Sequence, residues 1–304
     1  MALPRARRVA GVSGPERPVR GSERPLSGPD RPVRLLALDL DGTLLGPDRV
    51  IRPRVRSAIA AAIESGVIVT IATGRMYRST LPFAQSLGIV APIICYQGGY
   101  VRDLPAPDGT PGRLLLHRTM PGVVAREAIG WARARGFDPH VNVDDRLVMQ
   151  ADATSAEDYE RLSGIGAEFV EDLPASVRGP VTKVLAVGRA PLPEQWLPGA
   201  RAAFGGRAQV TVSHPEYLEW NAHGVTKGRA VRWLARRLGI SLAQTMAIGD
   251  QYNDAEMLAE VGHGVAMGDS PEAVRVAARH VTATIAQDGA ALAIETLVLG
   301  REAA

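Results

Sequence analysis

Two carboxylates stand two residues apart where a largely apolar run ends near the start of the chain. Asp39 and Asp41 belong to the segment Asp39-Leu-Asp-Gly-Thr43, which follows the run 33–38. One carboxylate of such a pair can act as a nucleophile and the other as a general acid and base. A turn at Gly42 would also explain the segment, but a carboxylate after a buried strand is costly without a metal or hydrogen-bond donors. We therefore predict catalytic roles for Asp39 and Asp41.

A polar tripeptide, Thr73-Gly74-Arg75, follows a second apolar run, 67–71. The threonine hydroxyl and the backbone N–H groups of the following turn can hold a phosphoryl oxygen. A simple capped helix start would give the same tripeptide, so its interpretation as a phosphate site depends on the other polar clusters.

Lys227 is notable because the chain otherwise uses arginine. The sequence holds two lysines, Lys183 and Lys227, and 33 arginines, so a remaining lysine can mark a place where a compact ammonium is needed. Lys227 also lies in the first turn of a predicted helix, where a positive charge opposes the helix dipole at a cost of about 0.3–1 kcal/mol. A residue that breaks a local rule without evident compensation favours a functional site.

A second acidic segment follows the apolar run 245–248. It supplies the carboxylates of Asp250 and Asp254 and the amide of Asn253. Oxygen ligands without histidine or cysteine are what Mg²⁺ prefers. Alone, the segment could be an acidic loop that caps a helix, but together with the first carboxylate pair it indicates a magnesium site.

Continuous apolar strands separated by helices predict an α/β fold with a Rossmann-like parallel sheet that is covered on both faces. Ligands bind such sheets at the carboxyl ends of the strands, so we expect the four polar clusters to lie together. The predicted strands are 33–38, 67–71, 92–96, 245–248, 265–267 and 281–282, and the predicted helices are 53–66, 79–87, 226–238, a segment through 257–258, and 290–299.

The middle of the chain has a different pattern. One predicted helix, 123–135, occurs among short strands, with proline and glycine clusters between them. We interpret residues 113–216 as an α+β cap domain inserted into one α/β core. The core then consists of residues 34–112 and 217–300.

The basic charge of the chain is concentrated at its beginning. The whole sequence has a formal net charge of +3 and a pI of about 9.3. The first 34 residues hold eight arginines and three acidic residues, a net charge of +5, and the rest has a net charge of −2. We predict that residues 1–33 form a disordered basic leader. An alternative hypothesis is a nucleic-acid-binding or scaffold protein that acts through this leader.

Composition excludes several classes of protein. The single cysteine, Cys95, cannot form an internal disulfide or a cysteine-based zinc site, which suits a reducing cytosol. No apolar run approaches the roughly 18 residues of a transmembrane helix, and the beginning of the chain lacks the apolar region of a signal peptide. We expect a cytoplasmic protein with neither membrane nor nucleic acid as partner of its folded body.

In their order and residue identities, the four clusters resemble the motifs of the haloacid dehalogenase superfamily. More narrowly, they resemble those of its Cof-type (class IIB) phosphatases, which have a large inserted cap. The resemblance runs from about Leu35 to Leu299 and includes Val265-Ala-Met-Gly268 and Asp288-Gly289. It implies a Mg²⁺-dependent hydrolase of a small phosphate ester, either a sugar phosphate or a phosphorylated cofactor. A phosphomutase that uses the same aspartyl-phosphate chemistry is the alternative within this superfamily. The oligomeric state stays open.

The resemblance also implies a role for each motif residue. Asp39 would attack phosphorus and form an aspartyl-phosphate, and Asp41 would protonate the leaving alkoxide and then activate water. Thr73 and Lys227 would bind phosphoryl oxygens. Mg²⁺ would bind to Asp39, to Asp250 and to the backbone carbonyl of Asp41. Asp254 would position metal-bound water or Lys227. The residues implied to surround the phosphate and substrate are Gly42, Thr43, Gly74, Arg75 and Asn253.

Three positions depart from the pattern of the Cof-type phosphatases. Gln97-Gly98-Gly99 stands where Asn-Gly-Ala is usual, and Asp269 and Ile285 stand where asparagine is usual. None belongs to the four motifs. We therefore expect altered specificity at these positions rather than loss of catalysis.

Overall fold

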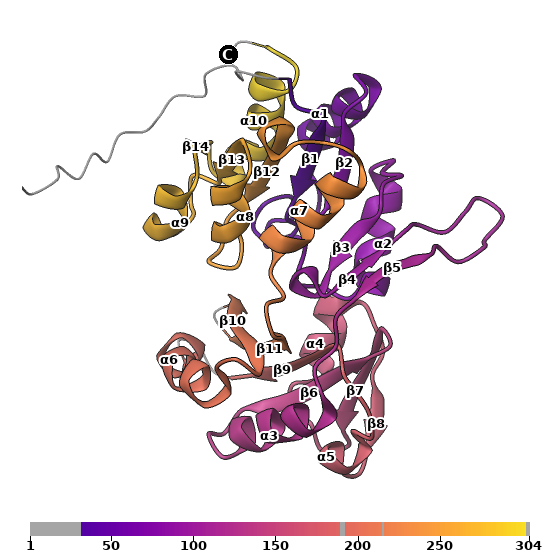
Figure 1. Cartoon of the computed structure of the whole chain (residues 1–304), viewed down its shortest axis with the longest axis vertical. Helices are drawn as coiled ribbons and strands as arrows, with labels where there is room; N and C mark the ends of the chain where they lie inside the picture. The colour runs from indigo at the N-terminus through magenta and orange to yellow at the C-terminus, as the bar shows by residue number, and fades with distance from the viewer. Residues whose placement is uncertain (1–31, 189–191, 215, 302–304) are drawn as a thin grey trace, which may run out of the picture.

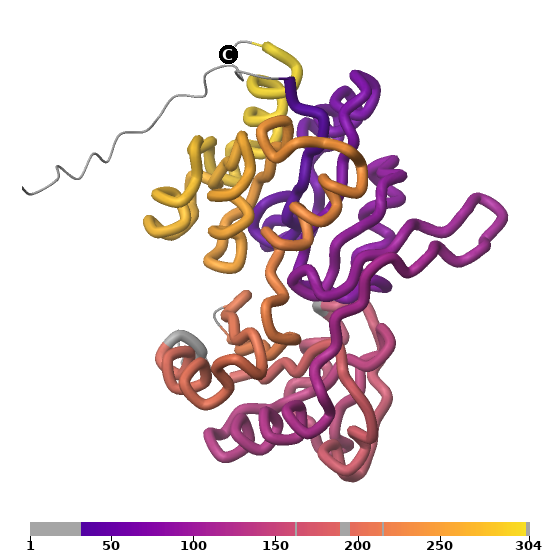
Figure 2. Tube along the Cα trace, in the orientation of Figure 1, coloured from indigo at the N-terminus to yellow at the C-terminus, as the bar shows by residue number. Residues whose placement is uncertain are grey.

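The computed structural model describes residues 32–188, 192–214 and 216–301. Nearly all of the predicted basic leader, residues 1–31, lies outside the described residues. Within them the chain forms two lobes, joined by two segments that run between them (Figures 1 and 2).

The first lobe is built on a parallel sheet of five strands among the described residues, in the order β14-β13-β12-β1-β2. Every residue of β1 and β12 is buried, as expected of strands that are apolar on both faces. The strands are β1 (Leu35–Leu38), β2 (Ile68–Ile71), β12 (Thr245–Gly249), β13 (His263–Ala266) and β14 (His280–Val281).

Helices cover both faces of this sheet. On one face, α1, α2 and α10 pack against the larger strand residues, such as Leu36, Leu38 and Ile248. On the other face, α7, α8 and α9 pack against small residues such as Ala37 and Ala247. The predicted Rossmann-like α/β core is confirmed. The helices are α1 (Pro53–Glu64), α2 (Tyr77–Ser86), α7 (Lys227–Arg237), α8 (Ala255–Glu260), α9 (Glu272–Ala277) and α10 (Gly289–Leu297), with the short 3-10 segments η1 (Tyr96–Gly98), η2 (Leu242–Gln244) and η3 (Ile285–Gln287).

A small antiparallel sheet continues the core beyond β2. It consists of β3 (Ile93–Cys95), β4 (Tyr100–Arg102) and β5 (Leu114–His117). A parallel bridge between Ala72 and Ile94 joins it to the end of β2. The segment between β4 and β5 extends away from the body of the core (Figure 1).

The second lobe is an α+β unit, which confirms the predicted cap architecture. Its mixed sheet has six strands among the described residues, in the order β10-β11-β9-β6-β7-β8. One face packs against α3 and α6, and the other faces the core (Figure 1). The elements are β6 (Asp138–Val143), β7 (Arg146–Gln150), β8 (Glu168–Val170), β9 (Lys183–Val187), β10 (Ala208–His214), β11 (Tyr217–Ala222), α3 (Gly122–Arg133), α4 (Ala156–Ser163), α5 (Leu173–Ser176) and α6 (Leu192–Phe204).

Strand pairing differs from the expected limits of the cap, 113 and 216. β5 pairs with β4 on the core side, so the core extends past 112. β11 pairs with both β9 and β10, so the segment 217–222 belongs to the cap sheet rather than to the core. We propose that the cap spans residues 118–222, because hydrogen-bonded strands define the unit and the local sequence does not reveal their partners.

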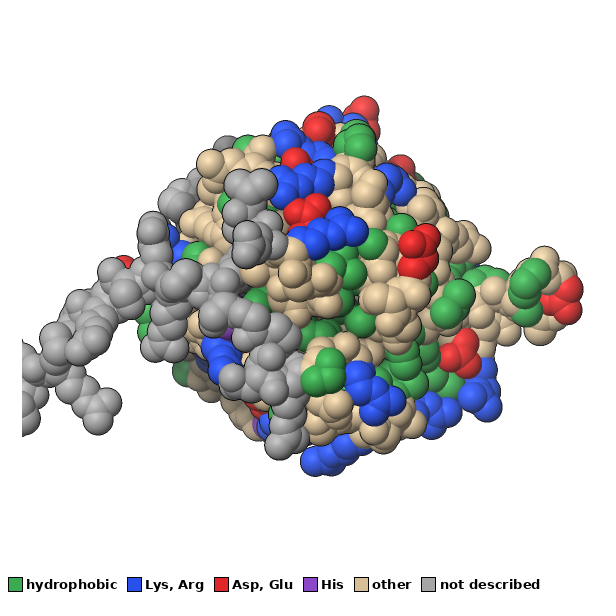
Figure 3. All heavy atoms as spheres, turned by 90° about the horizontal axis from the view of Figure 1, so that it is seen from above, with side chains coloured by type: hydrophobic (Ala, Val, Ile, Leu, Met, Phe, Trp, Pro, Cys, Tyr) green, Lys and Arg blue, Asp and Glu red, His purple; other side chains and the backbone are tan. Residues whose placement is uncertain are grey.

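The face of the core opposite to the cap carries basic and acidic side chains interspersed with one another (Figure 3). Among the described residues, the longest apolar helices are too short or too polar to cross a membrane.

Candidate active site

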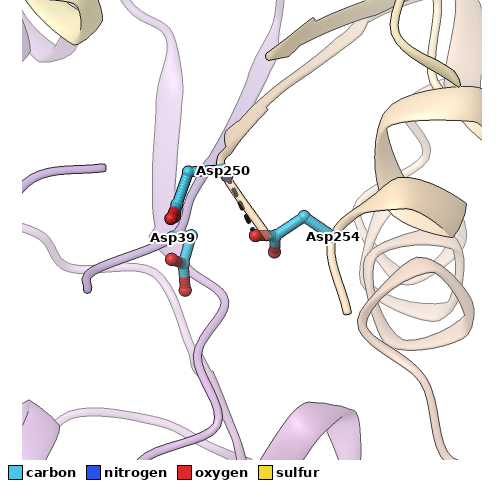
Figure 4. A group of neighbouring side chains, drawn as sticks. All are labelled: Asp39, Asp250 and Asp254. Atoms are coloured by element: carbon cyan, nitrogen blue, oxygen red, sulfur yellow. Dashed lines mark hydrogen bonds between the residues drawn. The ribbon is translucent and has the colours of Figure 1, made fainter. Parts of the chain in front are cut away.

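The ends of β1 and β12 lie side by side and bring two of the predicted carboxylates together. Leu38 pairs with Ile248, so Asp39 and Asp250 lie near each other beyond the paired strands. Asp254 approaches from the start of α8, and one oxygen from each of the three carboxylates lies within 4.8 Å of the others (Figure 4). All three side chains are buried.

Lys227 places its ammonium between two of these carboxylates. Its Nζ donates hydrogen bonds to Asp39 Oδ1 at 2.6 Å and to Asp254 Oδ1 at 2.7 Å. Burial alone would lower the pKa of Lys227, but Asp254 and Asp39 outweigh it and hold the pKa above its usual value. The ammonium therefore stays charged, which explains how a lysine is tolerated at the start of α7.

The remaining negative charge at this site is uncompensated. Burial is the main cause that raises the pKa of Asp39 to about 7, and burial together with Asp39 and Asp254 raises that of Asp250 to about 9. Buried like charges that face one another need a cation or a proton. The donor set is made of oxygen atoms alone, so the three residues fit a hard divalent ion such as Mg²⁺.

Asp254 is less available to an ion than the other two carboxylates. Its Oδ1 accepts from Lys227, and its Oδ2 accepts from the backbone N–H groups of Asp250 and Gln251 at 3.1 and 3.0 Å. These bonds fix both the ammonium and the loop that carries Asp250. These contacts fit a positioning group, and we propose that role for Asp254.

The loop after Asp39 closes over Asp250. Gly42 has a φ of +86°, and a Cβ there would lie 2.2 Å from Asp250 Oδ2, so both conformation and space require glycine. The Thr43 hydroxyl donates to Asp250 Oδ1 at 3.0 Å. In this structure Gly42 and Thr43 thus shape the acidic cluster rather than offer a free phosphate contact.

Asp41 lies outside the buried cluster. Its side chain is 55% exposed and forms an ion pair with Arg75. Thr73 is buried beside it, with its Oγ1 accepting from the backbone N–H of Arg75 at 3.2 Å. All four sequence clusters therefore meet at one end of the core sheet, and the Arg75 side chain contacts a carboxylate instead of pointing freely toward a phosphate.

A buried polar network that the sequence did not predict joins the cap to this site. The Gln97 amide donates to Glu219 Oε2 and accepts from Asn253 Nδ2, both at 3.0 Å. Lys183 Nζ donates to the carbonyl of Gly74 at 3.0 Å and to Glu219 Oε1 at 3.3 Å. The departure at Gln97 is thus an internal link between Asn253 and the cap.

A cavity of about 440 Å³ lies between the two lobes and reaches the candidate site at Asp39. Asp39, Asp41 and Thr73 line its core side, and Lys183 and Glu219 line its cap side. Asp269 and Ile285, the other two departures from the family pattern, also line this cavity. They are therefore placed where they can affect what the cavity holds.

A family model of haloacid dehalogenase-like hydrolases matches residues 36–294. The chain belongs to this family. The predicted membership is confirmed, and so is the prediction that the protein is an enzyme, a phosphatase of this superfamily. The match includes the core strands, the inserted cap and all four motifs.

Relatives of known name cover most of the chain. The HMP-PP phosphatase of Serratia proteamaculans is 33% identical over 240 residues, which are 78% of this chain and 84% of that protein. The pyridoxal phosphate phosphatase of Escherichia coli K12 is 31% identical in an alignment of 270 residues that covers 82% of this chain and 92% of that protein. A haloacid dehalogenase-like hydrolase from Bacteroides thetaiotaomicron superposes with a TM-score of 0.75 at 27% identity, over 86% of this chain and 98% of that one.

Proposed function

We propose that the protein is a Mg²⁺-dependent phosphomonoester hydrolase that acts through an aspartyl-phosphate on Asp39. The observation that carries the proposal is the position of Asp39, a buried carboxylate that lines the cavity and accepts a 2.6 Å hydrogen bond from Lys227. A carboxylate held by an ammonium at the bottom of a cavity is suited to in-line attack on phosphorus.

In the first step a carboxylate oxygen of Asp39 forms a bond to phosphorus while the bond to the ester oxygen breaks. Asp41, the exposed carboxyl at the cavity, acts here in its protonated form and gives that proton to the departing alkoxide. In the second step Asp41 takes a proton from water, whose oxygen attacks the aspartyl-phosphate and releases inorganic phosphate and free Asp39. Thr73, Lys227 and Asn253 bind the phosphoryl oxygens, where preorganised donors stabilise developing charge.

The ion would be held by Asp39, Asp250 and the backbone carbonyl of Asp41, with Asp254 fixing Lys227 beside them. When bound, Mg²⁺ neutralises charge on the phosphoryl oxygens and helps to orient the ester. The identity of the ion is part of the proposal, and the support for it is the all-oxygen, buried donor set.

The substrate we propose is a small phosphorylated metabolite. The relatives named above are an HMP-PP phosphatase and a pyridoxal phosphate phosphatase, and a cavity of about 440 Å³ holds a molecule of that size. The cap separates the cavity from bulk water on one side, which suits a reaction in which water takes part only in the second step.

The test is release of inorganic phosphate from a panel of phosphate esters, with Mg²⁺ and with a chelator. We expect turnover that needs Mg²⁺ and is lost in Asp39→Asn, while Asp108→Asn, an exposed aspartate on the extended β4–β5 segment, retains it. Turnover by Asp39→Asn, or full turnover in chelator, would overturn the mechanism. Transfer of the phosphoryl group to a sugar hydroxyl instead of water would indicate a phosphomutase.

A further inference from the structure

Three buried polar side chains connect the cap sheet to the carboxyl end of the core sheet. Glu219 of β11 and Gln97 of η1 are each 2% exposed, and Lys183 of β9 is 1% exposed. None of the three belongs to the four motifs, and none takes part in the reaction steps proposed above. Burying so many polar groups is costly unless each has a partner, so their hydrogen bonds show what the cluster holds in place.

The Glu219 carboxylate determines which way the Gln97 amide faces. A carboxylate only accepts hydrogen bonds, so the amide atom that lies 3.0 Å from Glu219 Oε2 must be Nε2 of Gln97. Gln97 Oε1 then faces Asn253, and because a carbonyl oxygen also only accepts, Asn253 must donate with Nδ2, again at 3.0 Å. The direction of both hydrogen bonds therefore follows from the carboxylate of Glu219.

At the end of this chain of hydrogen bonds, the Asn253 amide has a single orientation. Its Oδ1 is buried and has no hydrogen-bond partner among the described residues. One N–H of Nδ2 is used by Gln97, so the second N–H is the group that this amide can offer to an anion in the cavity that Asn253 lines. An amide turned the other way would place an oxygen acceptor there, and that oxygen would repel a phosphoryl oxygen.

The same side chains hold the backbone that follows β2. Lys183 Nζ donates to the carbonyl of Gly74, and the backbone N–H of Gln97 donates to the carbonyl of Thr73, both at 3.0 Å. A Cβ on residue 74 would lie 2.4 Å from Gln97 Nε2, so the amide lies directly against this backbone. Glu219 accepts from both Lys183 and Gln97 and therefore connects the two groups that fix these carbonyls.

From these contacts we infer that Glu219, a cap residue outside the four motifs, is a positioning residue for the phosphoryl group. Its carboxylate orients the Asn253 amide through Gln97 and holds Lys183 on the Gly74 carbonyl. The inference rests on the proposed function, in which Asn253 binds a phosphoryl oxygen. Although Glu219 lines the cavity, it acts on the phosphoryl group and not on the alcohol part of the substrate.

The test exchanges the side chains of residues 97 and 219. In Glu219→Gln the carbonyl oxygen stays with the donors Ser213 and Lys183, so the NH₂ group faces Gln97 and the amides of Gln97 and Asn253 must both turn. When Glu219→Gln is combined with Gln97→Glu, the amide at residue 219 donates to the carboxylate at residue 97, which again accepts from Asn253. The single variant reverses the Asn253 amide and the double variant restores it.

The first measurement is the Kd of inorganic phosphate in the presence of Mg²⁺, by isothermal titration calorimetry. We expect Glu219→Gln to weaken binding about ten- to a hundredfold, the effect of one hydrogen bond to a charged group, and the double variant to recover most of the affinity. The second measurement is kcat/KM for phosphate esters of several different alcohols. In Glu219→Gln it should fall by the same factor for every ester, because the altered contact is to the phosphoryl group that they share.

Two further variants control for folding and for loss of charge. Gln97→Met keeps the buried ion pair of Lys183 and Glu219 but has no amide, so it should weaken phosphate binding even if Glu219→Gln does not fold. Glu127→Gln removes an exposed carboxylate from α3, on the face of the cap sheet that points away from the core, and should leave both measurements unchanged.

Three results overturn the inference: unchanged phosphate affinity in Glu219→Gln or Gln97→Met, a double variant that binds phosphate no better than Glu219→Gln, or a loss of kcat/KM that differs from ester to ester. The last result would assign Glu219 to recognition of the alcohol instead. Hydrolysis that persists in Asp39→Asn, or no hydrolysis of any ester, overturns the proposed function, whereas the calorimetric comparison still decides whether Glu219 positions the groups that bind phosphate.

Discussion

The Arg75 guanidinium binds the Asp41 carboxylate through two parallel hydrogen bonds, each 2.6 Å long. The arginine is mostly buried, whereas the aspartate is 55% exposed, so the arginine is the fixed partner of the pair. It also lies over the ring of Phe83. We infer that Arg75 sets the direction of Asp41 and favours its carboxylate form, which accepts the proton of water in the second step, a role that differs from the phosphate contact its motif implied.

Replacement of Arg75 by lysine tests this role. A lysine keeps the charge but cannot form both hydrogen bonds, so Asp41 loses its fixed orientation. We expect Arg75→Lys to lower kcat about ten- to a hundredfold with little change in KM. Steady-state kinetics with a small ester measures the two constants. Arg54→Lys is the control, because Arg54, in the first turn of α1, forms a similar two-bond pair with Glu295 of α10. A rise in KM with an unchanged kcat would instead indicate that Arg75 binds the phosphate.

Removal of one carboxylate from the acidic cluster should abolish stabilisation by Mg²⁺. At a hundredfold excess over its Kd, a bound ion stabilises a protein by about 2.7 kcal/mol. We expect Mg²⁺ to raise the melting temperature of the wild type but not of Asp250→Asn. Without the ion, Asp250→Asn should be at least as stable as the wild type, because the pKa of Asp250 is raised to about 9, so that folding at neutral pH costs the uptake of a proton that asparagine does not need. Asp269→Asn, in the same cavity, should keep the response, and a full response in Asp250→Asn would refute the site.

Asp145 of the cap stabilises the start of a core helix. It lies in the turn between β6 and β7, and its carboxylate accepts from the backbone N–H groups of Tyr77 and Arg78 at 2.9 and 3.0 Å and from the Tyr96 hydroxyl at 2.8 Å. Helix α2 has no side-chain cap from its own N-cap residue, Met76. Asp145 of the cap domain therefore provides the N-terminal hydrogen-bond acceptor that helix α2 lacks from its own sequence.

We expect Asp145→Ala to lower the free energy of unfolding by about 1–3 kcal/mol. Asp144→Ala is a close control: both aspartates have a positive φ, 48° and 59°, but Asp144 is exposed. Thermal unfolding of the two variants separates loss of the helix cap from the backbone cost of alanine in a left-handed turn. Equal losses in both would show that the interlobe hydrogen bonds contribute nothing.

A buried histidine in the cap should make stability depend on pH. Burial and then the charge of Lys183 lower the pKa of His140 to about 3, and the ring of Tyr159 covers one side of it. Between pH 6.5 and 3 the unfolded chain binds a proton here that the folded chain does not. Stability therefore falls as pH is lowered through this range, by up to about 1.4 kcal/mol per pH unit.

The comparison is between the wild type and His140→Gln, which cannot take up this proton. Denaturant unfolding at several pH values between 4.5 and 7 should show a shallower loss of stability in the variant. His223→Gln, a change of an exposed histidine, should follow the wild type. Parallel curves for wild type and His140→Gln would contradict the assignment.

The core and the meeting of its four polar clusters could be predicted from the sequence because each rests on local rules. Runs such as 67–71 are apolar on both faces, and this pattern has few solutions other than a parallel strand. Once the strands are parallel, their carboxyl ends must share an edge, which brings Asp39 and Asp250 together. The helices 53–64 and 227–237 were recognisable from the spacing of their buried residues.

The limits of the cap and its polar network could not be predicted in this way. β11 and its partner β9 are separated by many residues, and nothing local tells which sheet a short strand joins. The contact of Gln97 with Glu219 depends on how the two lobes pack. Only a fixed tertiary structure could show that a glutamine with a φ of 58° spans the distance between cap and core.

The order of strands in the core sheet also determines at which stage of chain synthesis the acidic cluster can form. Leu35 pairs with Ile68 on one side and with Thr245 on the other, and every strand of the cap is synthesised between these two partners. One edge of β1 therefore stays open while the ribosome makes the cap, which can fold as a unit in the meantime. Asp39 meets Asp250 only when β12 enters the sheet. The acidic cluster can therefore form only after the cap has been synthesised. A chain that ends before Thr245 contains the whole cap but lacks the acidic cluster beneath it.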